Sequence, residues 1–361
     1  VDTILFWCWR DEVFGQESDG YGISGNDGFS SERLAAMKET GKVLGRERQL
    51  LSGFQPDKPK VGIWFGPRNY FLHWAQSKRG DQAMNAILGY ADALLKMKIP
   101  YRIVEENHLD ELEGLSVLFM PGTFVLSDEQ EQALLQFVQD GGVLFCESWT
   151  GAFTREGFYR YPENRFLCRN AGILEIGRRL LPDNRLAMSF RDESFLVEAE
   201  KWITPMQLVT KEDQGSDAEQ ARGKERARGD EQARGEERAH GEEQARGEER
   251  AHGEERISGE KAALILEVAY GKGRIIACGT FCGNPYWERG KGQLPELAGH
   301  VCKSAGIQPV FRLTGDHSVE VQVKSGTSGL SVGSSAKRVH FILAETDRPV
   351  ELEWYDGATI Q

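Results

Sequence analysis

The chain has 361 residues, of which 40% are hydrophobic and 10% aromatic, enough for two or three domains with ordinary cores. Its 56 acidic and 44 basic residues give a net charge of −12, which disfavours nucleic acid and anionic membrane surfaces as partners. No apolar stretch approaches the roughly 20 residues that a membrane span requires, so we expect a cytoplasmic protein.

The chain opens with a predicted buried strand. Residues 1–10 are rich in β-branched and aromatic side chains, and charges, glycines and an aromatic residue crowd together at residues 11–23. Because α/β enzymes place their sites just past strand ends, this segment is expected to be the last piece of a catalytic domain. A helix is predicted at residues 30–51, with serines as N-caps, and a linker at residues 53–59.

Strands and helices alternate from residue 61 onward. Strands are predicted at residues 61–65, 101–105, 116–120 and 143–147, and helices at residues 81–98 and 129–139. Ser127 and Gln130 have the spacing of a capping box. This alternation implies crossover connections and a parallel sheet covered on both faces. The fold class is therefore predicted to be α/β, with a flavodoxin-like or amidotransferase-like three-layer domain.

The second half of the chain is less regular at first and then turns to β-structure. Residues 151–210 are predicted to contain a helix around residues 174–180 and strands near Leu186 and Leu196. The remaining predicted elements are a hairpin of residues 262–269 and 274–278, a helix at residues 294–305, and strands at residues 319–323, 339–343 and 350–355.

A repeat interrupts this pattern. Residues 221–256 are six tandem hexads of the form Ala-Arg/His-Gly followed by three charged or amide residues, with no aliphatic side chain larger than alanine. Such a sequence cannot bury enough apolar surface to offset roughly 1–2 kcal/mol of backbone entropy per residue. We therefore expect residues 211–259 to be a disordered surface insertion, with a charged interaction arm as the alternative.

Six cysteines lie far apart and do not form the pattern of a disulfide framework. Cys278 and Cys282 could be half of a zinc site or two buried free thiols. Cys146 stands at a predicted strand end, where a nucleophile would be useful. It lacks the G-x-C-x-G elbow, however, and His300 is the only histidine downstream of it in the ordered part of the predicted domain.

The first segment resembles a known family. The sequence Phe-Trp-Cys-Trp-Arg at residues 6–10, followed by Gly-Gln-Glu at residues 15–17 and Gly-Tyr-Gly-Ile at residues 20–23, is similar to the last barrel strand and loop of glycoside hydrolase family 42 β-galactosidases. The resemblance implies three parts: the last strand and helix of a TIM barrel (1–53), an amidotransferase-like trimerisation domain (60–308) and a small all-β domain (309–361).

The resemblance also implies a chemistry. Retaining glycosidases use two carboxylates about 5–5.5 Å apart, as acid/base and as nucleophile. In this family both glutamates come from earlier barrel strands, so no catalytic residue is assigned here. Trp9, Arg10 and Glu17 would instead contact the sugar, through an apolar face, charge-assisted bonds and hydroxyl hydrogen bonds respectively. Many members carry a histidine where this chain has Gly20, so that sugar contact is missing or replaced.

The prediction is a C-terminal part of a β-galactosidase, which needs no cofactor or metal, acts on β-galactosides and assembles as a homotrimer. On this interpretation the chain is inactive by itself. The alternative is a non-catalytic oligomerisation module of a glycosidase. A minor alternative is a cysteine-dependent hydrolase that uses Cys146.

Overall fold

The computed structural model describes residues 5–15, 21–25, 31–48, 54–209, 263–309, 311–314, 319–326, 337–344 and 351–354, so the predicted insert at 211–259 lies outside the described residues. The chain divides into two units. One comprises residues 1–58 and 315–350, and the other residues 59–314 and 351–361. The described strands between residues 315 and 350 thus group with the N-terminal segment, whereas residues 351–354 group with the larger unit. The three-part division drawn from the sequence stays a prediction.

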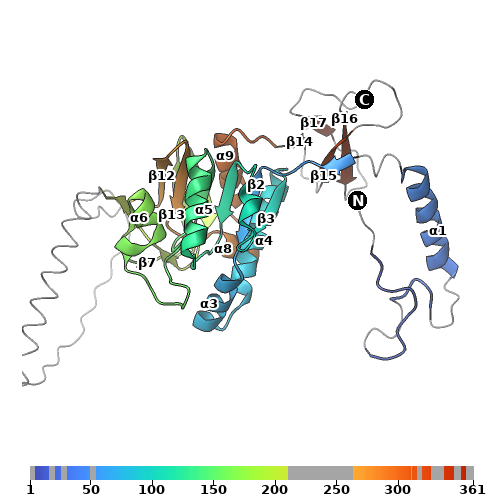
Figure 1. Ribbon diagram of the computed structural model, residues 1–361, viewed down its shortest axis with the longest axis horizontal. Helices are drawn as coiled ribbons and strands as arrows, with labels where there is room; N and C mark the ends of the chain where they lie inside the picture. Colours follow the sequence, from blue (N-terminus) through green and yellow to red (C-terminus); the bar gives the residue numbers. More distant parts are fainter. Residues whose placement is uncertain are drawn as a thin grey trace, which may run out of the picture. The chain divides into compact units, whose positions relative to one another are not determined.

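The larger unit is built on a six-stranded sheet (Figure 1). Its strands are β2 (Val61–Phe65), β3 (Tyr101–Glu105), β4 (Val117–Met120), β5 (Val143–Cys146), β12 (Ile265–Tyr270) and β13 (Gly273–Cys278). They lie in the order β12-β13-β5-β4-β2-β3, and all neighbours are parallel except β12 and β13, which form an antiparallel hairpin. The predicted parallel sheet and hairpin are confirmed.

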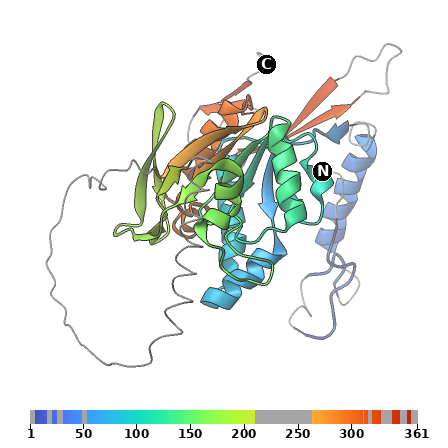
Figure 2. The ribbon, with the colours of Figure 1, turned by 60° about the vertical axis from the view of Figure 1, so that its left-hand side comes forward.

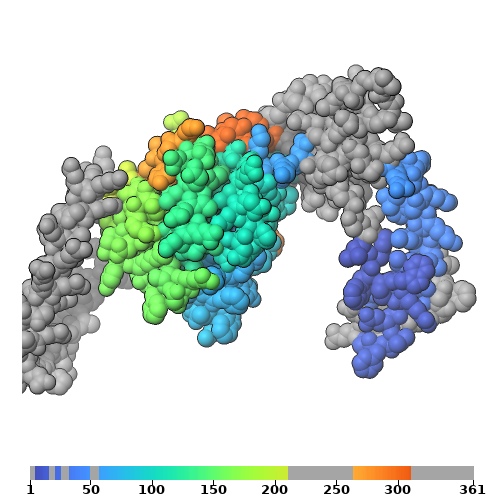
Figure 3. Space-filling view, in the orientation of Figure 1, coloured from blue at the N-terminus to red at the C-terminus, as the bar shows by residue number. Residues whose placement is uncertain are grey.

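Each face of this sheet carries its own apolar core, because successive side chains of a strand point to opposite faces. Ile63, Phe119 and Phe145 pack with α4 (Asp81–Lys96) and α9 (Leu294–Ser304). Their neighbours in sequence, such as Leu118 and Leu144, pack with α5 (Asp128–Gln139). In the space-filling view, the described residues of this unit pack closely into one body (Figure 3).

The start of α5 has the predicted capping box. The Ser127 hydroxyl accepts a hydrogen bond from the backbone N–H of Gln130 at 3.2 Å, and the Gln130 side chain accepts one from the Ser127 N–H at 2.9 Å. These two bonds satisfy donors that a helix N-terminus otherwise leaves unpaired.

The region between β5 and the insert departs from the prediction. The helix expected around residues 174–180 is wrong: α6 (Phe166–Ala171) ends at Gly172, whose φ is +65°, and two short strands follow. These are β6 (Ile173–Glu175) and β7 (Arg179–Leu180), which pair with β11 (Met206–Leu208) and β10 (Trp202–Ile203). The helix α3 (Pro67–Ser77) and the short helix α8 (Gly283–Arg289) were not predicted.

The strands predicted near Leu186 and Leu196 are confirmed. They are β8 (Arg185–Phe190) and β9 (Glu193–Glu198), an antiparallel hairpin drawn in yellow-green in Figure 2. The last pair of this unit is β14 (Phe311–Thr314) with β17 (Glu351–Trp354).

The smaller unit contains α1 (Ser31–Arg46) and a three-stranded antiparallel sheet of β1 (Phe54–Pro56), β15 (Val319–Gly326) and β16 (Lys337–Ala344). The predicted linker at 53–59 therefore includes a strand. The opening strand is also wrong for its described residues, 5–10, which form no ladder beyond one bridge between Arg10 and Ser24. Apolar composition favours a strand only where a neighbouring strand can pair with it.

Candidate functional site

The three predicted sugar-binding residues are only partly covered by the described structure. Glu17 lies outside the described residues, the Trp9 side chain is 68% exposed, and Arg10 is exposed. A hollow of about 300 Å³ in this unit is bordered by Phe6, Trp7 and Tyr21 together with residues of α1. Roles for Trp9, Arg10 and Glu17 therefore stay proposals.

A buried carboxylate holds this N-terminal loop. Asp11 is 4% exposed, and its Oδ1 accepts hydrogen bonds from the backbone N–H of Gly22 and from Arg33 Nη1 of α1, the latter at 3.3 Å. Arg33 Nη1 also donates to the carbonyl of Gly22. This arrangement ties Asp11 and Gly22 to each other and to Arg33 of α1.

A second buried carboxylate lies at the carboxyl edge of the parallel sheet, in the larger unit. Glu147 follows β5 directly and is fully buried. Its Oε1 accepts hydrogen bonds from the N–H groups of Cys282 (2.7 Å) and Gly283 (2.9 Å) and from the Tyr90 hydroxyl (3.0 Å), and its Oε2 from the N–H of Gly122 (2.8 Å). Burial raises the pKa of the Glu147 carboxyl, and the four donated bonds oppose that effect. Glu147 thus joins the loops after β4, β5 and β13 to α4.

A third buried carboxylate, Glu175, is paired with an arginine. The side chains of Glu175 and Arg165 are 2% and 3% exposed and form a salt bridge. Glu175 also accepts hydrogen bonds from the Trp149 N–H at 2.8 Å and the Ser148 hydroxyl at 3.2 Å. Arg165 in turn donates to the Tyr159 hydroxyl. The loop that follows β5 is therefore fastened by a buried charge pair.

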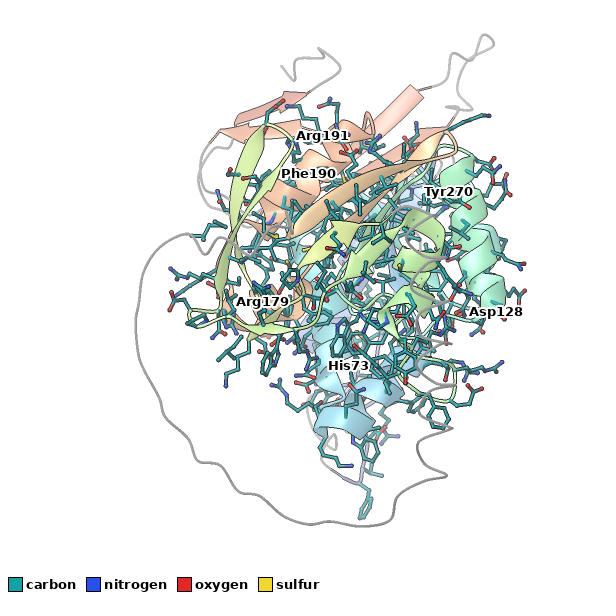
Figure 4. The ribbon with its side chains drawn as sticks, turned by 90° about the vertical axis from the view of Figure 1, so that its left-hand side faces the viewer. His73, Asp128, Arg179, Phe190, Arg191 and Tyr270 are labelled. Carbon is teal, nitrogen blue, oxygen red and sulfur yellow. The ribbon has the colours of Figure 1, made fainter. Side chains whose placement is uncertain are left out.

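Aromatic rings cover this loop. Trp149 contacts Phe153 and Tyr159 with ring centroids 6.0 and 5.6 Å apart, and Phe124 packs on the same cluster. His73 of α3, labelled in Figure 4, stacks on Phe124 with centroids 4.4 Å apart. Burial lowers the pKa of the His73 imidazole, although its bond to the Gly122 carbonyl opposes this. A neutral ring is the expected form, which suits a packing role better than a charged contact.

The surroundings of Cys146 do not suit a nucleophile. Cys146 is fully buried, and burial raises the pKa of its thiol, whereas a reactive cysteine needs an exposed thiolate. His300 contacts the rings of Phe190 and Phe195 and pairs with Glu193. The contacts of His300, the candidate base, are thus with other residues than Cys146, and this arrangement argues against the cysteine-dependent hydrolase.

Cys278 and Cys282, the pair with C-x3-C spacing, lie close together without further metal ligands among the described residues. The sulfurs of Cys278 and Cys282 lie 3.9 Å apart, and both side chains are buried. Within the described ranges, no group of three or more His, Cys, Asp or Glu residues is placed to hold a metal ion. The described cysteines are free thiols.

Comparison with solved structures shows what the fold resembles. Gan42B, a family 42 β-galactosidase from G. stearothermophilus solved as a catalytic mutant, aligns with a TM-score of 0.61 at 14% identity over 97% of this chain and 48% of its own. The β-galactosidase from Bacillus circulans sp. alkalophilus aligns with a TM-score of 0.60 at 12% identity over 95% of this chain and 48% of its own.

Two curated β-galactosidase sequences also match this chain, over a smaller part of it. No family model matches the sequence. β-Galactosidase BbgII of Bifidobacterium bifidum is 25% identical over 157 residues, which are 42% of this chain and 22% of BbgII. β-Galactosidase BgaA of Clostridium cellulovorans is 17% identical over 151 residues, which are 42% of this chain and 23% of BgaA.

The predicted resemblance is therefore confirmed: the chain resembles a part of glycoside hydrolase family 42 β-galactosidases. It spans less than half the length of the solved structures, and its matches cover about a quarter or less of the curated relatives. Among its described helices, none is long and apolar enough to cross a membrane.

Proposed function

We propose that this chain is part of a β-galactosidase that releases terminal non-reducing β-D-galactose residues by double displacement. The observation that carries this proposal is the similarity to family 42 β-galactosidases, which extends over 97% of this chain but only 48% of Gan42B. The two carboxylates of such a reaction stand about 5–5.5 Å apart, and both would come from barrel strands outside these 361 residues.

The parts of the chain would then have separate tasks. Residues 1–53 would complete the barrel, where Trp9 would offer an apolar face to the sugar, and Arg10 and Glu17 would bind carboxylates and hydroxyls. Residues 60–308 would form a three-layer, amidotransferase-like trimerisation domain. The buried cores on both faces of its parallel sheet support that description. Residues 309–361 would form a small β-domain.

Galactosidase turnover tests the assignment directly. The 361-residue chain alone is expected to hydrolyse an aryl β-galactoside no faster than buffer, because the proposed acid/base and nucleophile are outside it. The same chain joined to its upstream coding sequence is expected to turn over the substrate. That upstream sequence should encode an Asn-Glu on one predicted strand and a Glu on a later one. An enzyme-like rate from the chain alone would contradict the proposal.

A specific observation favours the second candidate, a non-catalytic assembly module that forms a homotrimer. Helix α3 exposes three large aromatic side chains, Tyr70 (41%), Phe71 (68%) and Trp74 (53%). Exposed aromatic groups of this size are typical of protein contact surfaces.

The mass of the protein in solution shows whether the chain is a trimer or a monomer. The expected result is three times the 40.5 kDa chain mass, reduced to monomer when Phe71 and Trp74 are both replaced by glutamate. The matched control replaces the exposed Phe158, which lies on a different segment, and should leave the trimer intact. A monomer in the unsubstituted chain would argue against the module.

A further inference from the structure

A small cavity lies beside the buried pair of Arg165 and Glu175. Its volume is about 270 Å³, and it is bordered by Trp149, Tyr159, Pro162, Arg165, Gly177 and Arg178. Its walls come from the loop after β5 and the loop after β6. Ligands of parallel α/β sheets bind in this general position, outside the carboxyl ends of the strands. The volume is near the lower limit of ligand pockets, which suits a molecule about the size of one sugar ring.

The two arginines of the cavity differ in charge balance. Arg165 is neutralised by Glu175. Arg178 forms no ion pair or hydrogen bond with any residue that the structure describes, and its guanidinium lies 3.8 Å from the Trp149 ring centroid and 5.3 Å from that of Trp202. Partial burial lowers the pKa of Arg178, and Arg165 adds to this effect, but a guanidinium stays charged at neutral pH. Among the residues that the structure describes, Arg178 therefore has no counter-charge in this cavity.

The walls beside this charge are rigid and apolar. The backbone of Trp149 is left-handed, with φ of +64°, and its N–H donates to Glu175, while its indole packs against the rings of Phe124 and Phe153. The Tyr159 ring stands edge-on to the indole, with centroids 5.6 Å apart, and is held by Arg165. The Arg178 guanidinium lies over the Trp149 ring and that of Arg165 over the Tyr159 ring, so a ligand in this cavity would meet a positive charge directly beside the exposed parts of these aromatic side chains.

This combination selects a class of ligand. Guanidinium groups bind carboxylates and phosphates through two parallel hydrogen bonds. Tryptophan and tyrosine side chains provide large apolar contact areas for a ring-shaped body. A neutral sugar would contact only the aromatic side chains. An inorganic anion would pair only with Arg178.

We propose that this cavity binds a sugar-sized anion, whose carboxylate or phosphate pairs with Arg178 and whose ring packs against Trp149 and Tyr159. This site goes beyond the proposed galactosidase function and does not depend on it. The shared chemistry is an oxyanion on a sugar-sized ring, and a sugar acid and a sugar phosphate are its two sources.

Titration calorimetry on the full chain tests the proposal, with galacturonate, galactose 6-phosphate, galactose and inorganic phosphate as probes. At least one of the two anionic sugars is expected to bind saturably, with a dissociation constant in the millimolar range or tighter. Galactose and inorganic phosphate are each expected to bind about tenfold more weakly than that sugar. Comparison of the two anionic sugars identifies the carboxylate or the phosphate as the recognised group.

Variants locate the binding. Arg178→Gln is expected to weaken binding of the anionic sugar by about tenfold or more. Arg178→Lys, which keeps the charge but loses the planar fork, should fall between Arg178→Gln and the unsubstituted chain. The matched control is Arg179→Gln: Arg179 is the next residue, is exposed on β7 and is labelled in Figure 4. It should change affinity by no more than about twofold.

Three results would overturn the proposal: neither anionic sugar binds, galactose binds as tightly as both of them, or Arg178→Gln and Arg179→Gln weaken binding equally. Thermal unfolding of each variant shows whether it is folded. If Arg178→Gln does not fold, Arg178→Lys and Trp149→Phe decide instead, because both must weaken binding while Arg179→Gln does not.

Discussion

Replacing Glu147 with alanine is expected to lower the free energy of unfolding by at least about 4 kcal/mol, because each of its four buried donors left without an acceptor costs about 1–3 kcal/mol. Glu147→Gln keeps the volume and one acceptor oxygen, which can still take the three bonds that Oε1 takes now. Its amide group would face the N–H of Gly122, so we expect a loss of about 1–3 kcal/mol. Urea unfolding followed by circular dichroism measures both values.

The difference in unfolding free energy between the unsubstituted chain and Glu147→Gln should depend on pH, because only the unsubstituted chain carries a carboxyl at this position. Burial raises the pKa of Glu147 in the folded state above its ordinary value of 4.5. Between these two pKa values the folded state binds the proton more tightly than the unfolded state does. The stability that comes from this proton is therefore complete at low pH and is lost as pH rises through the folded-state pKa. Glu147→Gln has no such proton, so the stability advantage of the unsubstituted chain should shrink as pH rises.

Subtracting the unfolding free energy of Glu147→Gln from that of the unsubstituted chain removes the contributions of other titrating groups. Glu106, whose pKa burial also raises, and His73, whose pKa burial lowers, are present in both proteins. The comparison is made by urea unfolding between about pH 5 and pH 8. A difference that does not change with pH, or a Glu147→Ala variant as stable as the unsubstituted chain, would contradict the expectation.

The sheet of the larger unit could be predicted because its strands are buried on both faces. Strands such as β4 and β5 are continuous apolar runs bounded by glycines, prolines and helices, and that pattern is specific to parallel sheets. The short strands β6 and β7 could not be predicted. Their paired residues in β11 and β10 lie 22 to 35 positions further along the chain, from Leu180 with Trp202 to Ile173 with Leu208, and a local window contains neither partner strand.

The candidate site residues also divide into those that the local sequence marks and those that depend on contacts with distant residues. The roles predicted for Trp9, Arg10 and Glu17 rest on a local sequence that resembles one family. The local sequence does not predict the roles of Glu147 and Glu175, because the groups that surround a buried carboxylate come from distant positions: Gly122 and Cys282 in the case of Glu147. One signal was present in the sequence, a Glu-Ser-Trp directly after a buried strand, at the edge where parallel sheets bind ligands.

Replacing Glu175 with alanine is expected to lower the free energy of unfolding by about 3–5 kcal/mol, since it leaves the Arg165 guanidinium buried without a counter-charge. It also removes the acceptor for the backbone N–H of Trp149, a residue whose φ is positive. The double variant Arg165→Met with Glu175→Gln removes the charge as well and keeps an oxygen for Trp149. Although it loses the salt bridge entirely, it should be more stable than Glu175→Ala.

The control for this comparison is an ion pair at the surface. Glu288 pairs with Arg79, and their side chains are 31% and 49% exposed, so Glu288→Ala should cost no more than about 1 kcal/mol. Urea unfolding of the three variants orders them. If Glu175→Ala lost no more stability than Glu288→Ala, water would have to reach the Arg165 guanidinium in the folded chain. The loop after β5 would then be held by its aromatic contacts instead of by the charge pair, and the rigid wall at Trp149 would need another cause.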